Sequence, residues 1–384
     1  MKISNNTYIY IFLVALIPFL VDSHIFPSKS SYFPVLIITL LAHRKFGVIN
    51  NEGFVQAMFL LVFTGLLRFS QFSIPLFKDI GLMLIGILPF LFNSSFKVEA
   101  RTLNRWIIYG FLFAVGTSVF SFHVSMSDFI NSTFGVERGA STYTFGLFAI
   151  YWTQKKNYKW MAINCFFMLI GGKRIAMASI LICLLFAMLL KEKEGEAKLI
   201  WKILLFYIVF LYLRITFNFA HHAYDSMILD YTDKSADAFT LGRQQLYSAV
   251  IKMMPAKNYW GIGPGNTVEP LNAIVGLPRM HNDFLKIFAE NGMFLFCGYF
   301  YLLLRKIKYR QIPTLLFIFA LFTATNTLIY VYMLFMYCVF MNPDKYLYDI
   351  NDRGKHKVKK REKQLDQQLR RIKKNERFYG RGTS

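Results

Sequence analysis

The chain has 384 residues, of which 55% are hydrophobic and 18% aromatic, and its formal net charge is +22 at pH 7. This composition is more apolar than that of an ordinary soluble domain and indicates a membrane protein. The positive charge lies mostly in short loops and in the C-terminal tail, a distribution that indicates membrane topology rather than binding to nucleic acid. The four cysteines lie in apolar runs without a C-x-x-C spacing, which favours small core residues over disulfides or a zinc site.

Long apolar runs predict an all-α, polytopic integral membrane protein with about 12 transmembrane helices. The runs are continuous rather than alternating, which favours helices over the strands of a barrel. The first run lacks an A-x-A-like cleavage site, so we expect it to remain as a helix rather than to be removed as a signal peptide. The runs lie near 7–21, 30–43, 54–69, 74–92, 105–122, 141–153, 158–172, 175–190, 199–220, 283–304, 311–325 and 327–342.

Lys and Arg residues in the short loops predict which side of the membrane each loop faces, because positive loops stay in the cytoplasm. These groups lie at 43–45, 97–105, 155–159, 191–198, 305–310 and in the tail. Both termini are therefore expected to be cytoplasmic, with the long loop on the opposite side. The predicted organisation is membrane helices 1–9 over 1–220, a large periplasmic loop over 221–282, membrane helices 10–12 over 283–342 and a basic cytoplasmic tail over 343–384.

The loop 221–282 is the long external segment of this organisation, and long loops in compact proteins are often functional. Within it, the stretch Ala238–Met254 predicts an amphipathic helix that lies on the membrane surface. Thr240 is expected to cap the start of this helix, and Pro255 follows its end.

The most informative stretch is a Gly/Pro-rich loop over 259–278 that runs into Arg279, His281 and an apolar helix. Arg279 and His281 at a junction between loop and membrane suit an anionic, lipid-borne substrate, and His281 is able to relay a proton or bind an anion. Asn282 or Asp283 is expected to cap the helix. A structural role for His281 remains the alternative.

Three further signals come from charged residues in apolar surroundings or in the long loop. Lys173 and Arg174 sit at the external end of an apolar run, where either an anionic partner or snorkelling to the interface is expected. Arg243 presents the planar fork that suits phosphate oxygens, although an ordinary surface salt bridge also accounts for it. Glu290 lies inside an apolar run and is either a functional carboxylate or the partner of Lys286 one turn earlier.

Aromatic residues of the external loop, among them Tyr247 and Trp260, either stack on sugar rings or anchor the loop at the interface. His221 and His222 with Asp225 are a weak signal for a metal site, because adjacent residues on a helix point in different directions. Neither a nucleotide fingerprint nor a nucleophile motif accompanies these residues, so the sequence predicts no metal and no cofactor.

Three motifs follow one another along roughly residues 165–305. The first is GGKR, which ends at Arg174, the second is LGRQQLY around Arg243, and the third is WGIGPGNT followed by RMHNDFLKIFAENG. They resemble, in order, the small-residue-plus-Arg, Gly-Arg and H-N-x-x-L-x-x-x-x-E-x-G motifs of the O-antigen ligase/O-antigen polymerase superfamily of bacterial envelope glycosyltransferases. Lys173 departs from that pattern, in which a small polar residue commonly precedes the Arg.

The resemblance implies a GT-C-like, inverting, metal-independent glycosyltransferase at the periplasmic face of the bacterial inner membrane. It implies a donor glycan on undecaprenyl pyrophosphate, membrane lipid around the protein, a chain-length regulator protein as a partner, and no nucleotide sugar or nucleic acid. The catalytic residues implied are His281, Arg243 and Arg174. The residues implied to bind the pyrophosphate or the glycan are Arg279, Lys173, Asn282, Glu290, Tyr247 and Trp260.

Three functions remain open at this point. We favour a polymerase that joins lipid-linked repeat units, since that branch tends to be diverse in sequence and the match rests on motifs. The alternative is a ligase that transfers the finished glycan to lipid A–core or to a protein. A transporter of lipid-linked glycan is the third, but no internal repeat of the transporter kind is found.

Overall fold

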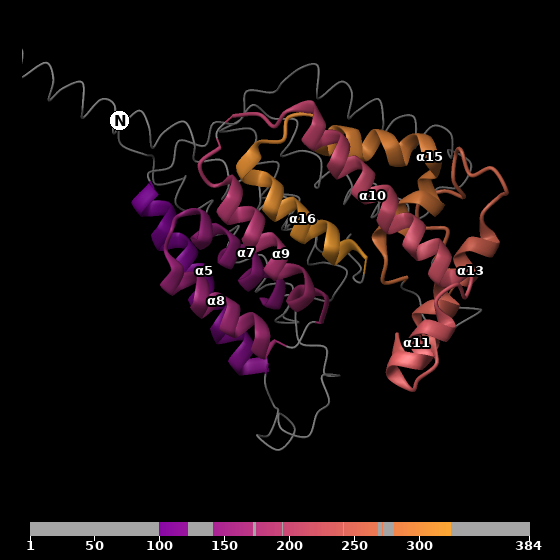
Figure 1. The fold of residues 1–384 in the computed structure, drawn as a ribbon, viewed down its shortest axis with the longest axis horizontal. Helices are drawn as coiled ribbons and strands as arrows, with labels where there is room; N and C mark the ends of the chain where they lie inside the picture. Colours follow the sequence, from indigo (N-terminus) through magenta and orange to yellow (C-terminus); the bar gives the residue numbers. More distant parts are fainter. Residues whose placement is uncertain are drawn as a thin grey trace, which may run out of the picture.

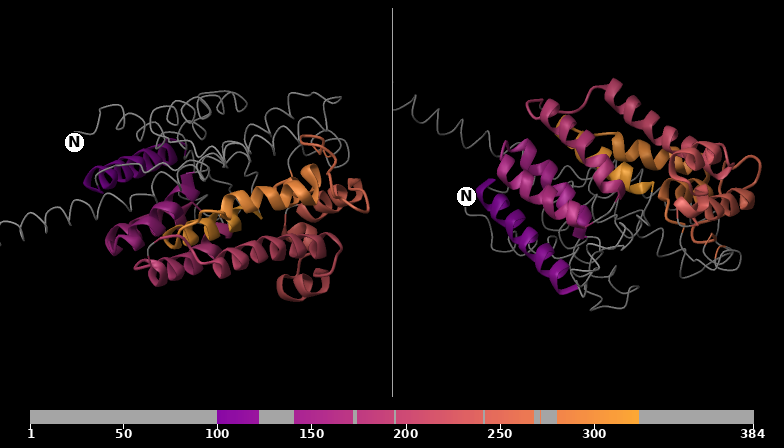
Figure 2. Two further views of the ribbon diagram at one scale, coloured as in Figure 1. Left: turned by 90° about the horizontal axis from the view of Figure 1, so that it is seen from above. Right: turned by 60° about the horizontal axis from the view of Figure 1, so that its bottom comes forward.

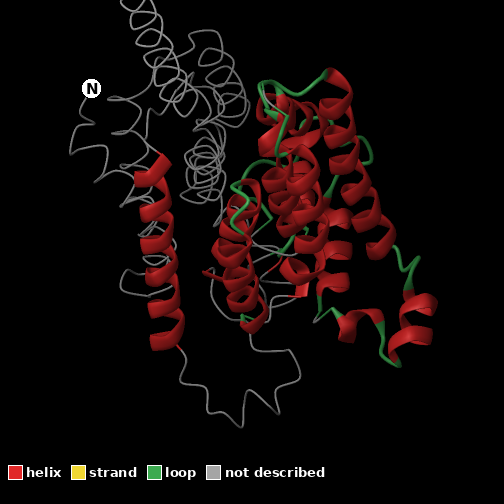
Figure 3. Ribbon diagram, turned by 60° about the vertical axis from the view of Figure 1, so that its left-hand side comes forward, coloured by secondary structure: helices red, strands yellow, loops and turns green. Residues whose placement is uncertain are grey.

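The computed structural model describes residues 100–121, 141–171, 174–193, 195–240, 242–267, 271 and 280–323. Within these ranges the chain is helical and forms no β-strand (Figures 1 and 3). The apolar runs near 7–21, 30–43, 54–69, 74–92 and 327–342 and the basic tail lie outside the described residues. The helices are α5 (Ala100–Ser121), α7 (Ser141–Gln154), α8 (Tyr158–Ile170), α9 (Arg174–Leu190), α10 (Leu199–Ala220), α11 (Asp225–Thr232), α12 (Ala236–Phe239), α13 (Arg243–Met253), α15 (Asp283–Leu304), the 3-10 turn η2 (Tyr309–Gln311) and α16 (Ile312–Phe322).

The longer helices occupy the apolar runs predicted from the sequence. In the described part, α10 and α15 are long and apolar enough to cross a bilayer. The 22 residues of α10 rise about 33 Å, close to the roughly 30 Å of a hydrocarbon core. Only 28% of its apolar window is buried inside the protein, against 72% for α15, so α10 presents a broad apolar face outward while α15 belongs to the core.

The core is built where α7 packs against α8, α9 and α16. The Asn157 side chain caps the start of α8 by accepting a hydrogen bond from the Trp160 backbone N–H at 3.3 Å, which closes the turn between α7 and α8. Helices α7 and α16 approach closely at Gly146, where a Cβ atom would come within 2.3 Å of the Phe317 ring. A small residue at this position therefore sets the spacing of the two helices.

Three basic loops meet at one end of the helix bundle. The backbone N–H of Ala197 donates to the Ile307 carbonyl at 2.9 Å, and Lys156 Nζ lies 2.6 Å from Glu192 Oε1. The loops that the charge pattern assigns to one side of the membrane therefore lie together in space. We call this region the basic end, and its loops are 155–159, 191–198 and 305–310.

Helix α15 folds back on itself at Gly292, whose φ of 75° and ψ of 176° lie outside the helical region. The rings of Phe284 and Phe300 are 5.5 Å apart, whereas a straight helix would separate these residues by about 24 Å. Phe288 and Phe296, closer to the break, are also in contact at 5.6 Å. The halves on either side of Gly292 rise only about 14 and 18 Å, so neither crosses a bilayer alone. The predicted span over 283–304 is thus a candidate membrane segment by length and composition, but it consists of two helical pieces joined at Gly292.

The part of the long loop before residue 254 is also helical, and α11, α12 and α13 gather at the end of the bundle away from the basic end (Figure 2). The single helix expected over Ala238–Met254 is divided instead. Thr240 ends α12, where its hydroxyl donates to the Ala236 carbonyl at 2.7 Å, and α13 begins afresh after Gly242. The predicted cap at Thr240 was wrong, because the glycine at φ 81° redirects the chain.

Candidate functional site

His281 lies at the point where the chain enters α15. It adopts a left-handed backbone conformation with φ 52°, which is uncommon for a residue with a side chain. The next residue, Asn282, caps the helix by accepting from the Leu285 backbone N–H at 3.0 Å, as predicted. Its amide group also donates to the Thr216 hydroxyl of α10 at 3.0 Å. Both ends of the buried Asn282 amide are thus engaged, directly after His281, which is partly exposed.

Tyr247 joins the start of α15 to two other helices. Its hydroxyl lies 3.3 Å from the His281 carbonyl and 3.5 Å from the Thr323 carbonyl, which closes α16. The side chain is 5% exposed, and burial raises the pKa of Tyr247 to about 12. The phenol therefore stays protonated at neutral pH and remains a hydrogen-bond donor to these carbonyls.

Arg243 is the first residue of α13 and lies one helical turn before Tyr247. Its positive charge acts on the Tyr247 phenol and opposes the effect of burial on the pKa of that group. Arg243 and His281, which are far apart in the sequence, therefore share Tyr247 as a neighbour. The structure therefore places the start of α13, with Arg243 and Tyr247, beside the backbone of His281 and Asn282.

Arg174 begins α9, but its side chain lies outside the described part of the chain, as do Lys173 and Arg279. Helix α9 packs along α16, and at the far ends of this pair Arg310 Nε donates to the Lys191 carbonyl at 3.1 Å. The two helices are therefore antiparallel, which places the start of α9 at the same end of the bundle as the end of α16 and the Tyr247 hydroxyl.

Gly171 explains why small residues precede this basic pair. A Cβ atom on Gly171 would lie 2.3 Å from the Thr142 hydroxyl, so the end of α8 packs directly on the start of α7. Any larger residue here would push the chain away from α7 just before Arg174. The GGKR motif thus has a packing reason in addition to its charge.

Glu290 is 1% exposed and lies in the first half of α15. Its Oε1 atom accepts a hydrogen bond from the Thr267 hydroxyl, and its Oε2 atom is 3.9 Å from Lys286 Nζ. The contact with Lys286, one of the two roles considered for Glu290, is therefore present. These contacts tie the Gly/Pro-rich loop to the core.

The same loop supplies hydrogen-bond partners to the backbone of α15 where Gly292 interrupts the helix. On one side of the break, the Ile262 and Gly263 N–H groups donate to the carbonyls of residues 289 and 290 at 2.9 and 2.8 Å. On the other side, the N–H groups of residues 293 and 294 donate to the carbonyls of Asn258 and Tyr259 at 2.9 and 3.3 Å. The loop thereby satisfies polar groups that a broken apolar helix would otherwise leave unpaired.

Trp260 and Tyr259 project from this loop and are about half exposed. Their rings lie 5.1 and 5.6 Å from the ring of Phe294, just after the break in α15. The first half of α15, about 14 Å long, separates this aromatic cluster from the backbone of His281. Trp260 thus stands at the turn of α15, away from the entry of that helix.

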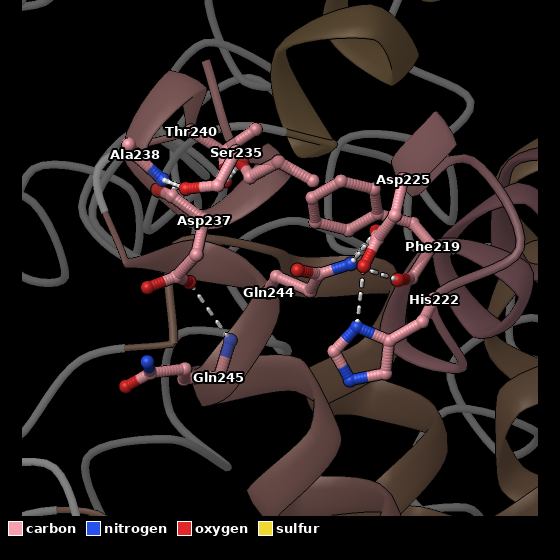
Figure 4. Close-up of polar contacts among 10 residues, drawn as sticks. Phe219, His222, Asp225, Ser235, Asp237, Ala238, Thr240, Gln244 and Gln245 are labelled. Carbon is pink, nitrogen blue, oxygen red and sulfur yellow. Dashed lines mark hydrogen bonds and ion pairs between the residues drawn. The ribbon is translucent and has the colours of Figure 1, made fainter. Parts of the chain in front are cut away.

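A second polar network, which sequence reasoning missed, holds the start of α13 (Figure 4). His222 Nδ1 lies 2.8 Å from Asp225 Oδ2, and the other oxygen of Asp225 accepts from the Gln244 amide at 2.5 Å. Of the three residues considered for a metal site, His222 and Asp225 thus hydrogen-bond to each other, and Asp225 also accepts from the Gln244 amide. A glutamine beside an arginine gives no local signal of such a contact.

Comparison with known families adds one finding. Residues 160–300 match the family described as O-Antigen ligase. No curated protein matches the chain. The matched segment runs from α8 into the second half of α15 and contains Arg243, Tyr247, His281 and Glu290.

Proposed function

Since residues 160–300 match the family described as O-Antigen ligase, whose members are membrane-associated, glycosyltransferase-like enzymes, we propose that the protein joins glycans carried on undecaprenyl pyrophosphate. The specific reaction we propose is that of an O-antigen polymerase, which adds one lipid-linked oligosaccharide repeat unit to another. The site would face the periplasm of the bacterial inner membrane, with the basic end toward the cytoplasm.

The placement of Arg243 and His281 around Tyr247 carries this proposal. In the reaction, an acceptor hydroxyl oxygen attacks the anomeric carbon of the donor sugar. The bond from that carbon to the pyrophosphate breaks, and its electron pair leaves with the pyrophosphate. Negative charge grows on the leaving group, and the guanidinium of Arg243 would stabilise it in a preorganised position.

His281 would take the proton that the acceptor hydroxyl loses, which requires a neutral imidazole at the start of the reaction. A direct displacement of this kind inverts the configuration at the anomeric carbon. Arg174, Lys173 and Arg279 would supply further positive charge for the pyrophosphate.

The buried candidates act differently in our proposal. Asn282 and Tyr247 orient His281 through the backbone, and Glu290 holds the loop against the broken helix. Trp260, whose side chain is exposed, is placed to stack on a sugar ring of the growing glycan.

A ligase that transfers the glycan to lipid A–core is the second candidate, because the description of the matching family names a ligase. Donor and leaving group are the same in both reactions, and only the acceptor differs.

One experiment separates these functions. Purified protein in liposomes receives undecaprenyl-pyrophosphate-linked repeat units as sole substrate with EDTA present, and products are resolved on a gel. A ladder of longer lipid-linked glycans that is lost in Arg243→Ala and His281→Ala supports the polymerase. Lys252→Ala and His221→Ala, exposed on the same helix and loop, serve as matched controls.

Product that forms only after lipid A–core is added would identify the ligase. Absence of product with either acceptor, together with movement of the lipid-linked glycan across the bilayer, would contradict both and favour a transporter.

A further inference from the structure

The first turn of α13 is held by side chains other than that of its N-cap residue. Its N-cap is Gly242, which has no side chain, and no side-chain cap bond forms there. The Asp237 carboxylate of α12 takes over this role by accepting from the Gln245 backbone N–H at 3.2 Å (Figure 4). A negative charge at this position also suits the positive end of the helix dipole.

Gln244 forms the second anchor of the same turn and is 3% exposed. Its amide nitrogen donates to Asp225 Oδ1 at 2.5 Å and to the Phe219 carbonyl at 3.0 Å. An amide group has two hydrogens, so these two bonds use its full donor capacity. The Phe219 carbonyl lies in the last turn of α10 and also accepts from the His222 backbone N–H at 3.2 Å. Gln244 thus binds together the end of α10, the start of α11 and the start of α13.

Gln244 directly follows Arg243, and its anchoring fixes the rotation of α13 about its own axis. Tyr247, three residues further on, depends on the same rotation to reach the His281 carbonyl. If the first turn of α13 rotated or frayed, Arg243 would move relative to His281. A displacement of a catalytic group by about 1 Å is able to lower the rate by about 100-fold.

We propose that Asp225 and Gln244 are positioning residues that set the direction of Arg243 in the reaction. They act by a side-chain hydrogen bond between the start of α11 and the start of α13, and neither contacts the substrate. The proposal rests on the proposed function, because it assigns a consequence to the placement of Arg243.

The pair can be tested by exchanging donor and acceptor. In Gln244→Glu, a carboxylate replaces the donating amide and faces the carboxylate of Asp225, so the bond is lost and the two charges repel. In the double variant Asp225→Asn with Gln244→Glu, the new asparagine amide donates to the new glutamate oxygen. The bond between the starts of α11 and α13 is then restored with its direction reversed, whereas the bond to the Phe219 carbonyl stays lost in both variants.

The measurement is kcat and KM for the lipid-linked donor in the liposome assay. We expect kcat of Gln244→Glu to fall about 10- to 100-fold, with a smaller change in KM, because Arg243 acts mainly in the transition state. The double variant should recover part of that loss, a response that a general weakening of the fold would not give. Asp225→Asn alone keeps an oxygen acceptor and should lose less than Gln244→Glu.

Gln245→Glu and Asp230→Asn are the matched controls, since both side chains are exposed on the same helices and change charge in the same way. Hydrogen exchange of the amides at 244–247 reports the anchoring directly, and it should speed up in Gln244→Glu and slow down again in the double variant.

The outcomes are distinguishable. Wild-type turnover in Gln244→Glu, or a double variant no better than Gln244→Glu, overturns the proposal while the proposed function stands. A wild-type protein that forms no glycan product overturns the proposed function and the proposal with it.

Discussion

Gly261 and Gly292 lie backbone to backbone, with the Gly/Pro-rich loop pressed into the break of α15. A Cβ atom on Gly292 would come within 2.4 Å of the Gly261 nitrogen, and one on Gly261 would come within 2.2 Å of the Glu290 carbonyl oxygen. Both glycines also have positive φ angles, 74° and 75°. The signature glycine of the HN…E-N-G motif is thus required twice, for its backbone conformation and for its lack of a side chain.

Gly292→Ala is therefore expected to destabilise the protein by roughly 3 kcal/mol or more, from about 1–3 kcal/mol of backbone strain and about 1–3 kcal/mol of steric overlap. Thermal unfolding in one detergent would measure the loss. Gly116→Ala is the control, because nothing lies within 4 Å of its Cβ position and alanine favours a helix. A Gly292→Ala protein as stable as Gly116→Ala would contradict the packing of the loop on α15.

The same region shows what could and could not be predicted from the sequence. The bounds of α10 and α15 follow from apolar composition, and the cap at Asn282 follows from its place before an apolar run. The reversal at Gly292 could not be predicted, because hydropathy registers composition and not direction. The contact between Phe284 and Phe300 that reveals it is made across the break.

The functional residues divide in the same way. Arg243 and His281 stood out by residue type and by motif, whereas Gln244 did not. Its partners lie 19 and 25 residues earlier in the chain, so only the tertiary fold brings them together. Thr240 was misassigned because the sequence pattern did not show that Gly242 would restart the helix.

Variants of Glu290 distinguish a structural role of this residue from a role in substrate binding. Glu290→Ala leaves Lys286 and the Thr267 hydroxyl without this buried partner and should cost about 3 kcal/mol of stability. Glu290→Gln keeps an oxygen for Thr267 and should lose less. If Glu290 positions the loop, Glu290→Gln should retain most of its turnover with an unchanged KM. A large rise in KM at wild-type stability would instead indicate that Glu290 binds the glycan.

The lowered pKa of Asp225 determines how the stability of the loop helices should respond to acid. The hydrogen bond from Gln244, and then that from His222, lowers the pKa of Asp225 below its usual value. Its contribution is therefore complete above the pKa of the unfolded chain, about 4, and is lost as the pH falls through the lower pKa of the folded state. The difference in unfolding temperature between wild type and Asp225→Ala should shrink as the pH falls below about 4. The difference for Asp230→Ala, measured in parallel, should not follow this course.

Gly171 offers a test of how Arg174 is placed, because it lies three residues before that arginine at the junction with α7. Its φ of −64° and ψ of −13° suit any residue, so Gly171→Ala introduces no backbone strain and acts only through the overlap with Thr142. We expect this overlap to cost about 1–3 kcal/mol of stability and to move the start of α9, with a fall in kcat. Thr142→Ala removes the methyl and hydroxyl groups that lie 2.7 and 2.3 Å from the added Cβ atom, so the double variant should regain part of both losses. If turnover falls in Gly171→Ala and the double variant restores stability but not turnover, the glycine acts on the reaction by a route other than its contact with α7.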